Sequence, residues 1–235
     1  MALENYNKVF ETEHYIFHFK ENSLAEKYIN YISNTQENCY KKITSLLNIF
    51  PNFKIHYYLI DSPIIVGKIY NEIHCDGDDE PCNGFTNYPD TIYCVYNNEI
   101  KCIGLHEDTH IISYCKFRPK SAFLREGLAM YMDKFWHSKT NERWVLESIN
   151  KGFEIDFFKL LNNNNFFKID CNISYPLSGA FVNFICENFG IKKFLSELYY
   201  TKKNYIKQLN LLFKYKKQDM HNSFVEFIKT KSEAK

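Results

Sequence analysis

Residues 106–110 of this chain read His-Glu-Asp-Thr-His, and residues 125–129 read Arg-Glu-Gly-Leu-Ala. Positions i and i+4 of an α-helix lie on one face, one turn apart. The imidazoles of His106 and His110 are therefore expected to face one point, as two nitrogen ligands of a zinc ion do. Glu107 is rotated by about 100° around such a helix, outside the ligand set but within reach of a water on the metal. The pattern predicts a helix that carries a zinc site with a carboxylate base beside it.

The sequence around the two histidines favours this helix. Asn97 or Asn98 can cap its first turn, and Glu99 suits the positive end of the helix dipole. The residue before a proline disfavours the α conformation, so the helix is expected to end at Arg118, before Pro119. Apolar side chains surround the histidines: Ile100, Ile103, Leu105, Ile111 and Ile112.

A second helical pattern follows and contains Glu126. Ser121 can cap this helix, and most of its residues are apolar: Phe123, Leu124, Leu128, Ala129, Met130 and Tyr131. A carboxylate is costly to bury among such neighbours unless something pairs with it, and a zinc ion would do so. Gly127 would let this helix approach the first one closely, although it can also be a glycine that only weakens the helix. Glu126 is the predicted third ligand; the alternative is an ordinary surface carboxylate.

These two motifs resemble the gluzincin zinc metallopeptidases, the group that contains thermolysin-like and aminopeptidase-N-like enzymes. The closest likeness is to compact bacterial proteins described as peptidase-MA-like. The resemblance implies His106, His110 and Glu126 as ligands of one Zn²⁺ ion, with water as the fourth ligand and Glu107 as the general base. It implies a zincin-like α+β fold with a small mixed sheet in the N-terminal half.

The resemblance extends over roughly residues 10–190. Residues 91–96 look like the edge strand along which such enzymes lay an extended peptide substrate, beside the active-site helix. The segment 175–181 resembles the one that carries a tyrosine stabilising the oxyanion, which would make Tyr175 a catalytic residue.

The sequence also departs from both branches of this group. The Gly-x-Met-x-Asn element that holds a free amino terminus in the aminopeptidase branch is not found, so nothing in the sequence supports exopeptidase activity. Thermolysin-like enzymes carry an Asp four residues after the third ligand, where this chain has Met130. Asp133 is an alternative orienting group for a ligand, or it is simply solvated.

Composition limits the classes of partner. The 235 residues are 45% hydrophobic, enough to bury a substantial core. The net charge of +1 gives no electrostatic case for nucleic acid or an anionic membrane. No apolar run approaches the ~18 residues of a membrane span, and the N-terminus lacks a signal-peptide pattern, so we expect a cytoplasmic protein. The expected partner is a peptide or protein substrate, and the oligomeric state is not predicted.

The eight cysteines form no paired C-x-x-C units, which argues against a structural zinc site. We interpret most of them as buried thiols in a reducing compartment. Cys102 shares the face of His106 and is either an extra ligand or a core residue. Residues 75–82 run from one cysteine to another and can form a disulfide staple, a weak cation site or a solvated turn. Their Gly, Pro and four acids favour the turn.

Hydrophobic periodicity predicts an α+β fold. Strands are expected at residues 12–20, 53–60 and 91–96. Besides the two motif helices, helices are expected at 22–47, 62–73, 144–149, 157–161, 175–189, 191–200 and 223–228. We expect a single zincin-like domain over residues 1–235, with a strand-rich part at about 1–117 and a helical part at 118–235.

The ligand set and the base together favour a zinc-dependent peptidase, in which Glu107 takes a proton from the attacking water and passes it to the leaving amine. Two alternatives stay open. One is a catalytically silent zinc-binding or regulatory module on a peptidase fold, and the other is a zinc hydrolase that acts on a non-peptide amide or ester.

Overall fold

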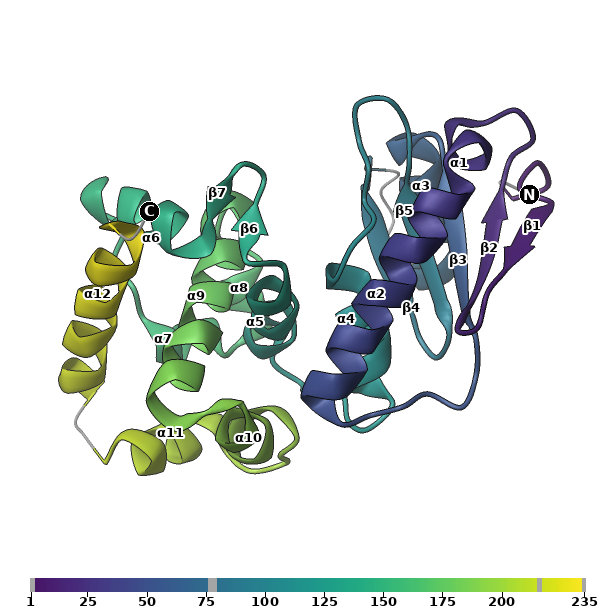
Figure 1. The fold of residues 1–235 in the computed structure, drawn as a ribbon. Coiled ribbons are helices and arrows are strands. Elements are labelled where there is room, and N and C mark those ends of the chain that lie inside the picture. The colour runs from purple at the N-terminus through teal and green to yellow at the C-terminus, as the bar shows by residue number, and fades with distance from the viewer. Residues whose placement is uncertain (1–2, 76–79, 215–216, 234–235) are drawn as a thin grey trace. The chain divides into compact units, whose positions relative to one another are not determined.

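The computed structural model describes residues 3–75, 80–214 and 217–233 (Figure 1). The chain divides into two compact units, Met1–Lys116 and Phe117–Lys235. The first contains a five-stranded mixed sheet and the second is mostly helical, so the described residues form an α+β fold. The single domain expected over residues 1–235 stays a prediction.

The sheet of the N-terminal unit has the order β1-β2-β3-β5-β4. Its three central strands, β2, β3 and β5, are parallel, and β1 and β4 pair antiparallel at the two edges. The strands are β1 (Lys8–Glu11), β2 (Tyr15–Phe19), β3 (Ile55–Ile60), β4 (Gly84–Asn87) and β5 (Thr91–Val95).

Helices cover the sheet of this unit. Alternating residues of β2 and β3, such as Tyr15, Phe17 and Tyr57, are fully buried. Helix α2 (Ile29–Leu47) packs against β2 on this side, where the Tyr15 ring lies 6.2 Å from that of Tyr40. Helix α3 (Pro63–His74) packs against β3, β4 and β5. The buried residues of the hydrophobic core around α3 are Tyr6, Ile60, Val66, Ile69, Phe85, Tyr93 and Val95.

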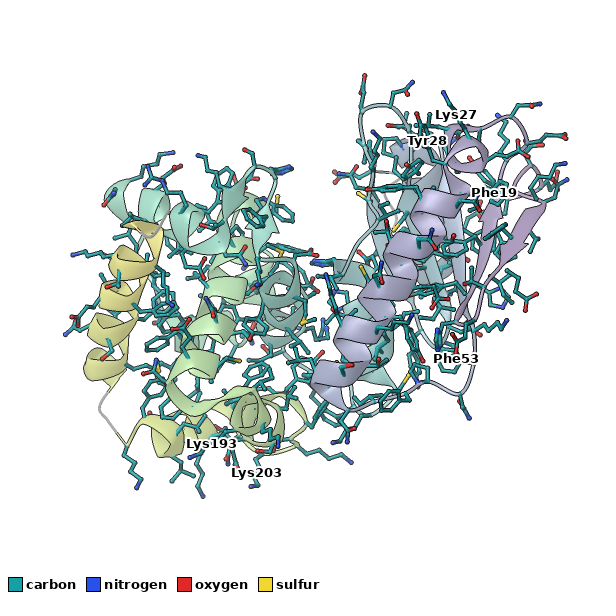
Figure 2. All side chains as sticks on the ribbon, in the orientation of Figure 1. Phe19, Lys27, Tyr28, Phe53, Lys193 and Lys203 are labelled. Atoms are coloured by element: carbon teal, nitrogen blue, oxygen red, sulfur yellow. The ribbon has the colours of Figure 1, made fainter. Side chains whose placement is uncertain are left out.

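The long helix expected at residues 22–47 is broken near its start. Ser23 caps the short helix α1 (Leu24–Lys27), and its side chain accepts from the Glu26 N–H. Tyr28 separates α1 from α2 with φ −110° and ψ 14°, outside the α region. The Lys27 ammonium lies 5.3 Å from the centroid of the Tyr28 ring (Figure 2). The periodicity therefore gave the right helix but missed its break.

The helix that carries the two histidines begins later than expected. Helix α4 is His106–Tyr114, so the predictions of a start near Glu99 and an end at Arg118 are wrong. The Asn97 side chain does cap, but it accepts the N–H groups of Glu99 and Ile100 in an isolated turn. Gly104 has φ +140°, which a helix does not allow. The first histidine of the motif is therefore also the first residue of the helix.

The edge strand was assigned to the wrong residues. Strand β5 lies between β3 and β4, so residues 91–96 do not form an edge. The edge strand next to α4 is β4, which contacts that helix. Strand β4 has only four residues, which is too short for an alternating pattern to predict a strand from the sequence. Only its pairing with β5 identifies it as a strand.

In the C-terminal unit, α9 (Cys171–Phe189) contacts α5 (Ala122–Asp133), α6 (Asn141–Asn150) and α12 (Lys217–Glu233). Fully buried aromatic rings fill the core of this unit: Phe123, Phe157, Phe166, Phe181 and Phe224. The smaller elements are the β6 (Phe135–Trp136) and β7 (Lys139–Thr140) hairpin, α7 (Phe157–Leu160), α8 (Asn163–Phe166), α10 (Ile191–Phe194), the π-helical turn η1 (Leu195–Tyr199) and α11 (Tyr205–Phe213). Each helix expected after residue 140 has a counterpart; the hairpin, α8 and α11 were missed.

The cysteines follow the sequence interpretation only in part. All eight are free thiols, so the disulfide alternative for Cys75 and Cys82 is wrong, and residues 76–79 between them lie outside the described residues. Cys39 and Cys94 are buried, whereas Cys75 and Cys171 are exposed. No helix among the described residues is both long and apolar enough to span a membrane.

Candidate metal centre

Helix α4 presents His106 and His110 one turn apart, as their spacing requires. Their ring centroids lie 5.0 Å apart with an interplanar angle of 82°. His110 is 6% exposed and His106 is half-buried. Two imidazoles that meet edge to face in this way can turn their nitrogens toward a common point, as a tetrahedral metal site requires.

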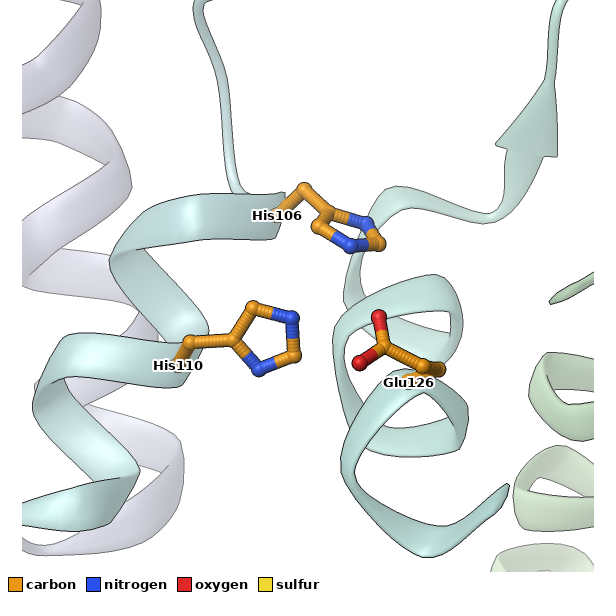
Figure 3. Close-up of side chains that lie close together, drawn as sticks. All are labelled: His106, His110 and Glu126. Atoms are coloured by element: carbon orange, nitrogen blue, oxygen red, sulfur yellow. The ribbon is translucent and has the colours of Figure 1, made fainter. Parts of the chain in front are cut away.

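Glu126 of α5 completes a group of three metal-binding side chains. One nitrogen of His106, one nitrogen of His110 and one carboxylate oxygen of Glu126 all lie within 4.8 Å of one another. Figure 3 shows the two rings extending from α4 and the carboxylate facing them. Two imidazole nitrogens and a carboxylate oxygen form a donor set that suits zinc. The structure thus contains a His-His-Glu group that can hold a metal ion.

The group brings together the three ligands predicted from the sequence. It contains no thiol, so within the part of the chain that the structure describes Cys102 does not belong to it. The Cys102 backbone is tied instead to the sheet, because its N–H donates to the Val95 carbonyl and its carbonyl accepts from the Tyr57 hydroxyl. The alternative of Cys102 as an extra ligand is therefore wrong.

Tyr114 orients the second histidine. Its hydroxyl lies 3.2 Å from His110 Nδ1, and the two rings are stacked with centroids 5.5 Å apart. With Nδ1 engaged in this hydrogen bond, Nε2 is the nitrogen that would bind a metal. The sequence held a signal for this contact, because Tyr114 stands four residues after His110 on the same helical face. Tyr114 is thus one orienting group for a ligand, and the role of Asp133 stays a prediction.

Thr86 holds the glutamate between the two histidines. The Thr86 hydroxyl lies 2.8 Å from Glu107 Oε2 and 3.1 Å from the Glu107 carbonyl oxygen, two acceptors for its one proton. Thr86 belongs to the edge strand β4, and the Glu107 side chain is half-buried. This contact joins residues 21 positions apart and was not predicted.

A buried polar network lies under the start of α4. Asp108 is completely buried, and its Oδ2 accepts hydrogen bonds from the Tyr15 hydroxyl and from Gln36 Nε2. Burial, and then the Asp108 carboxylate beside it, raise the pKa of Tyr15 well above its usual value, so the phenol stays a neutral donor. A buried carboxylate without such donors would be very costly.

Gln36 of α2 also fixes the residue at which the chain turns into α4. Its side-chain Nε2 donates to the Gly104 carbonyl at 3.1 Å, and its Oε1 accepts the Gly104 N–H at 2.9 Å. Gly104 stands two residues before His106. The side-chain amide therefore holds the backbone in the conformation from which the helix starts with its first histidine.

Close packing of α5 against α9 fixes the position of the helix that carries Glu126. A Cβ added to the neighbouring Gly127 would lie 2.8 Å from Val182 Cγ2 and 2.9 Å from the Ser178 carbonyl oxygen of α9. Gly127 thus allows a close approach between helices, but its partner is α9 and not the expected histidine helix. Arg125 Nη1 donates to the carbonyls of Pro119 and Lys120 at 2.8 Å each, which secures the start of α5.

Tyr175 lies on α9 and is half-buried. Its ring stacks on Trp136 with centroids 5.3 Å apart and lies 5.7 Å from the Phe166 ring. These contacts describe a tyrosine held by aromatic neighbours, and they do not assign its hydroxyl to an oxyanion. Its catalytic role stays a prediction, as does that of Glu107.

Comparison with known proteins does not assign the chain to a family. No family model matches the chain. No curated protein matches its sequence significantly. The resemblance to gluzincins therefore rests on the motif residues alone, and the structure itself shows an α+β fold and a His-His-Glu group that can hold a metal ion.

Proposed function

We propose that the protein is a zinc-dependent peptidase of the gluzincin type. The observation that carries this proposal is the approach of donor atoms from His106, His110 and Glu126 to within 4.8 Å of one another. A carboxylate at Glu107, directly after the first histidine, supplies the base that such chemistry needs. Three protein ligands leave a fourth position for water or substrate, as catalytic zinc sites do.

Different residues of the chain would have separate roles in peptide hydrolysis. Zinc, when bound, polarises a carbonyl and lowers the pKa of water toward about 7. Glu107 accepts a proton from the attacking water at its carboxylate and delivers it to the leaving amine. The Thr86 hydroxyl, 2.8 Å from Glu107 Oε2, restricts the rotation of that carboxylate. Tyr114 holds the His110 ring in the orientation that ligation needs.

The edge position of β4 supports a peptide as the substrate. Strand β4 pairs with β5 on one side and has no strand beside it on the other. The edge strand of a sheet is the place where an extended peptide can add as a further strand. Because Thr86 belongs to β4 and contacts Glu107, a peptide bound there would run close to the base.

The first test is Glu107→Gln, measured with a proteome-derived peptide library and by zinc content. The amide keeps the size of the side chain but cannot take the proton, so we expect zinc to be retained and turnover to fall by at least about 10³-fold. Unchanged turnover would remove Glu107 from this role. Wild-type protein that binds zinc but cleaves neither peptides nor esters would instead support the silent module, and cleavage of esters alone the non-peptide hydrolase.

The second test is Tyr175→Phe, which removes the hydroxyl but keeps the ring that stacks on Trp136. If this hydroxyl stabilises the oxyanion, kcat should fall by about 10²–10³-fold with little change in KM. Trp136→Phe is the matched control, because it alters the stacking partner and leaves the hydroxyl. An equal loss in both variants would assign Tyr175 to packing.

A further inference from the structure

A lysine-lined depression lies in the C-terminal unit, and none of its lining residues belongs to the proposed catalytic centre. It has a volume of about 650 Å³, and elements from α10 to the end of α11 line it. Five charged residues border it: Lys193, Glu197, Lys203, Lys207 and Lys214. We call these residues the lysine pocket. Lys193 and Lys203 are labelled in Figure 2, at the end of the unit where α10 and α11 lie.

The charge of this region stands out from that of the whole chain. The protein carries a net charge of +1, yet residues 192–217 contain eight lysines and a single acid, Glu197. The Lys203 ammonium lies 3.9 Å from the Glu197 carboxylate, and the Lys203 side chain is 65% exposed, so this pair contributes little. Within the part of the chain that the structure describes, Lys193, Lys207 and Lys214 have no acidic partner within 4.0 Å. The pocket therefore keeps an excess of positive charge.

Helix stability does not explain this excess. Lys207 stands in the first turn of α11, which has no acidic residue there. The amino end of a helix carries a partial positive charge, so a lysine at that position is unfavourable and an acid would be preferred. The Asn204 side chain caps the helix by accepting the Lys207 N–H at 2.9 Å. An anion in the pocket would offset both the helix charge and the repulsion among the lysines.

We propose that the lysine pocket binds a multiply phosphorylated anion. Lysine ammonium groups bind phosphate as mobile point charges, and several of them around one depression match a ligand with more than one phosphate. The volume of about 650 Å³ lies in the range of small-molecule sites and exceeds what a single phosphate fills. Leu211, which is 57% exposed, offers apolar surface to the carbon part of such a ligand.

Phosphate groups of this kind occur on soluble molecules and on lipid headgroups, and one set of titrations distinguishes the two. The chain of 235 residues, loaded with zinc, is titrated with inorganic phosphate, tripolyphosphate and ATP, and separately with phosphatidylcholine vesicles with or without phosphatidylinositol bisphosphate. We expect saturable binding of tripolyphosphate or ATP, weakening at higher salt, and weaker binding of inorganic phosphate. Binding only to vesicles with the bisphosphate lipid would place the same chemistry on a membrane.

Two matched double variants test the location of the site. Lys193→Gln with Lys207→Gln removes two charges from the pocket and should weaken binding by about tenfold or more. Lys41→Gln with Lys42→Gln removes two exposed charges from α2 and should change it less than about twofold. Chelation of zinc by the probe would be equal in both variants. The proposal would be overturned if no probe bound saturably or if both double variants weakened binding equally. Binding only to a single-stranded oligonucleotide would overturn it as well.

Discussion

Two clusters in this protein offer a metal ion three donors each, and they differ in how those donors are used. One consists of His106, His110 and Glu126, and the other of Glu13, His14 and Glu37. In both, the three donor atoms lie within 4.8 Å of one another. Proximity and number of donors therefore do not separate them.

In the second cluster, contacts with His14 engage both carboxylate oxygens of Glu37. Glu37 Oε1 accepts the His14 backbone N–H at 2.9 Å, and Glu37 Oε2 lies 2.7 Å from His14 Nδ1. The His14 ring also stacks on Tyr40 with centroids 3.8 Å apart. Hydrogen bonds that tie the residue before β2 to α2 therefore account for this cluster.

The first cluster is supported by groups outside it. Tyr114 contacts the His110 ring, and Thr86 holds the carboxylate of the adjacent Glu107. Such outer hydrogen bonds set the orientation of ligands and are characteristic of working metal sites. The surroundings of the donors are therefore a better criterion for a metal site than the number of donors.

The largest effect is expected on zinc affinity when each cluster loses one carboxylate. Glu126→Ala should lower the affinity by at least about a hundredfold, because one of three protein ligands is lost. Glu37→Ala should leave the stoichiometry at one zinc and the affinity unchanged. Competition with a chromogenic chelator measures both. A zinc affinity that fell with Glu37→Ala would show that the second cluster binds the metal after all.

A smaller effect is expected from the orienting tyrosine. Tyr114→Phe removes the hydroxyl at His110 Nδ1 and should lower zinc affinity by about 10–100-fold, the range for outer hydrogen bonds to ligands. Tyr40→Phe is the matched control, because the Tyr40 ring also stacks on a histidine, His14, but that histidine belongs to the second cluster. The same chelator competition applies, and equal affinities for the two variants would contradict the role of Tyr114.

The smallest effect concerns stability and pH at Glu37. Burial alone would raise the pKa of this carboxyl, but the hydrogen bonds from His14 and Thr12 and the electrostatic effect of His14 together outweigh it and lower the pKa below 4.5. The unfolded chain then takes up the proton first as the pH falls. The stabilisation is therefore complete above pH 4.5 and is lost as the pH falls through the folded value.

Urea unfolding of Glu37→Gln checks this linkage. The variant should be less stable by about 1–2 kcal/mol at pH 7, and the difference from wild type should shrink toward pH 3. Glu13→Gln serves as the control, since Glu13 is 78% exposed and lies 3.9 Å from His14. A destabilisation of Glu37→Gln that is the same at both pH values would exclude the proposed linkage.

The sequence predicted what depends on local spacing. The i, i+4 rule placed His106 and His110 together, and the apolar pattern of α5 marked Glu126 as a carboxylate in need of a partner. The alternation of β2 and the period of α2 and α9 gave an α+β fold for the same reason. Tyr114 was within reach of the same rule and was overlooked.

The sequence could not predict contacts between distant residues. Gln36 and Gly104 stand 68 positions apart, and their paired hydrogen bonds decide where α4 begins. The Asn97 cap indicated a helix start because the local pattern of a capped turn is the same as that of a capped helix. Likewise, β4 is an edge strand only through its pairing with β5, which leaves no local trace.

The contact between α5 and α9 has a consequence for mutational tolerance. A Cβ at Gly127 would collide with α9, and one at Gly179 would lie 2.6 Å from Met130 Cβ on α5. In a library of random substitutions, both glycines should be as intolerant as the residue they help to place, Glu126, although neither can bind a metal. Intolerance to substitution would thus outline the support of the site as well as the site itself, and only the chemistry of the side chains distinguishes the two.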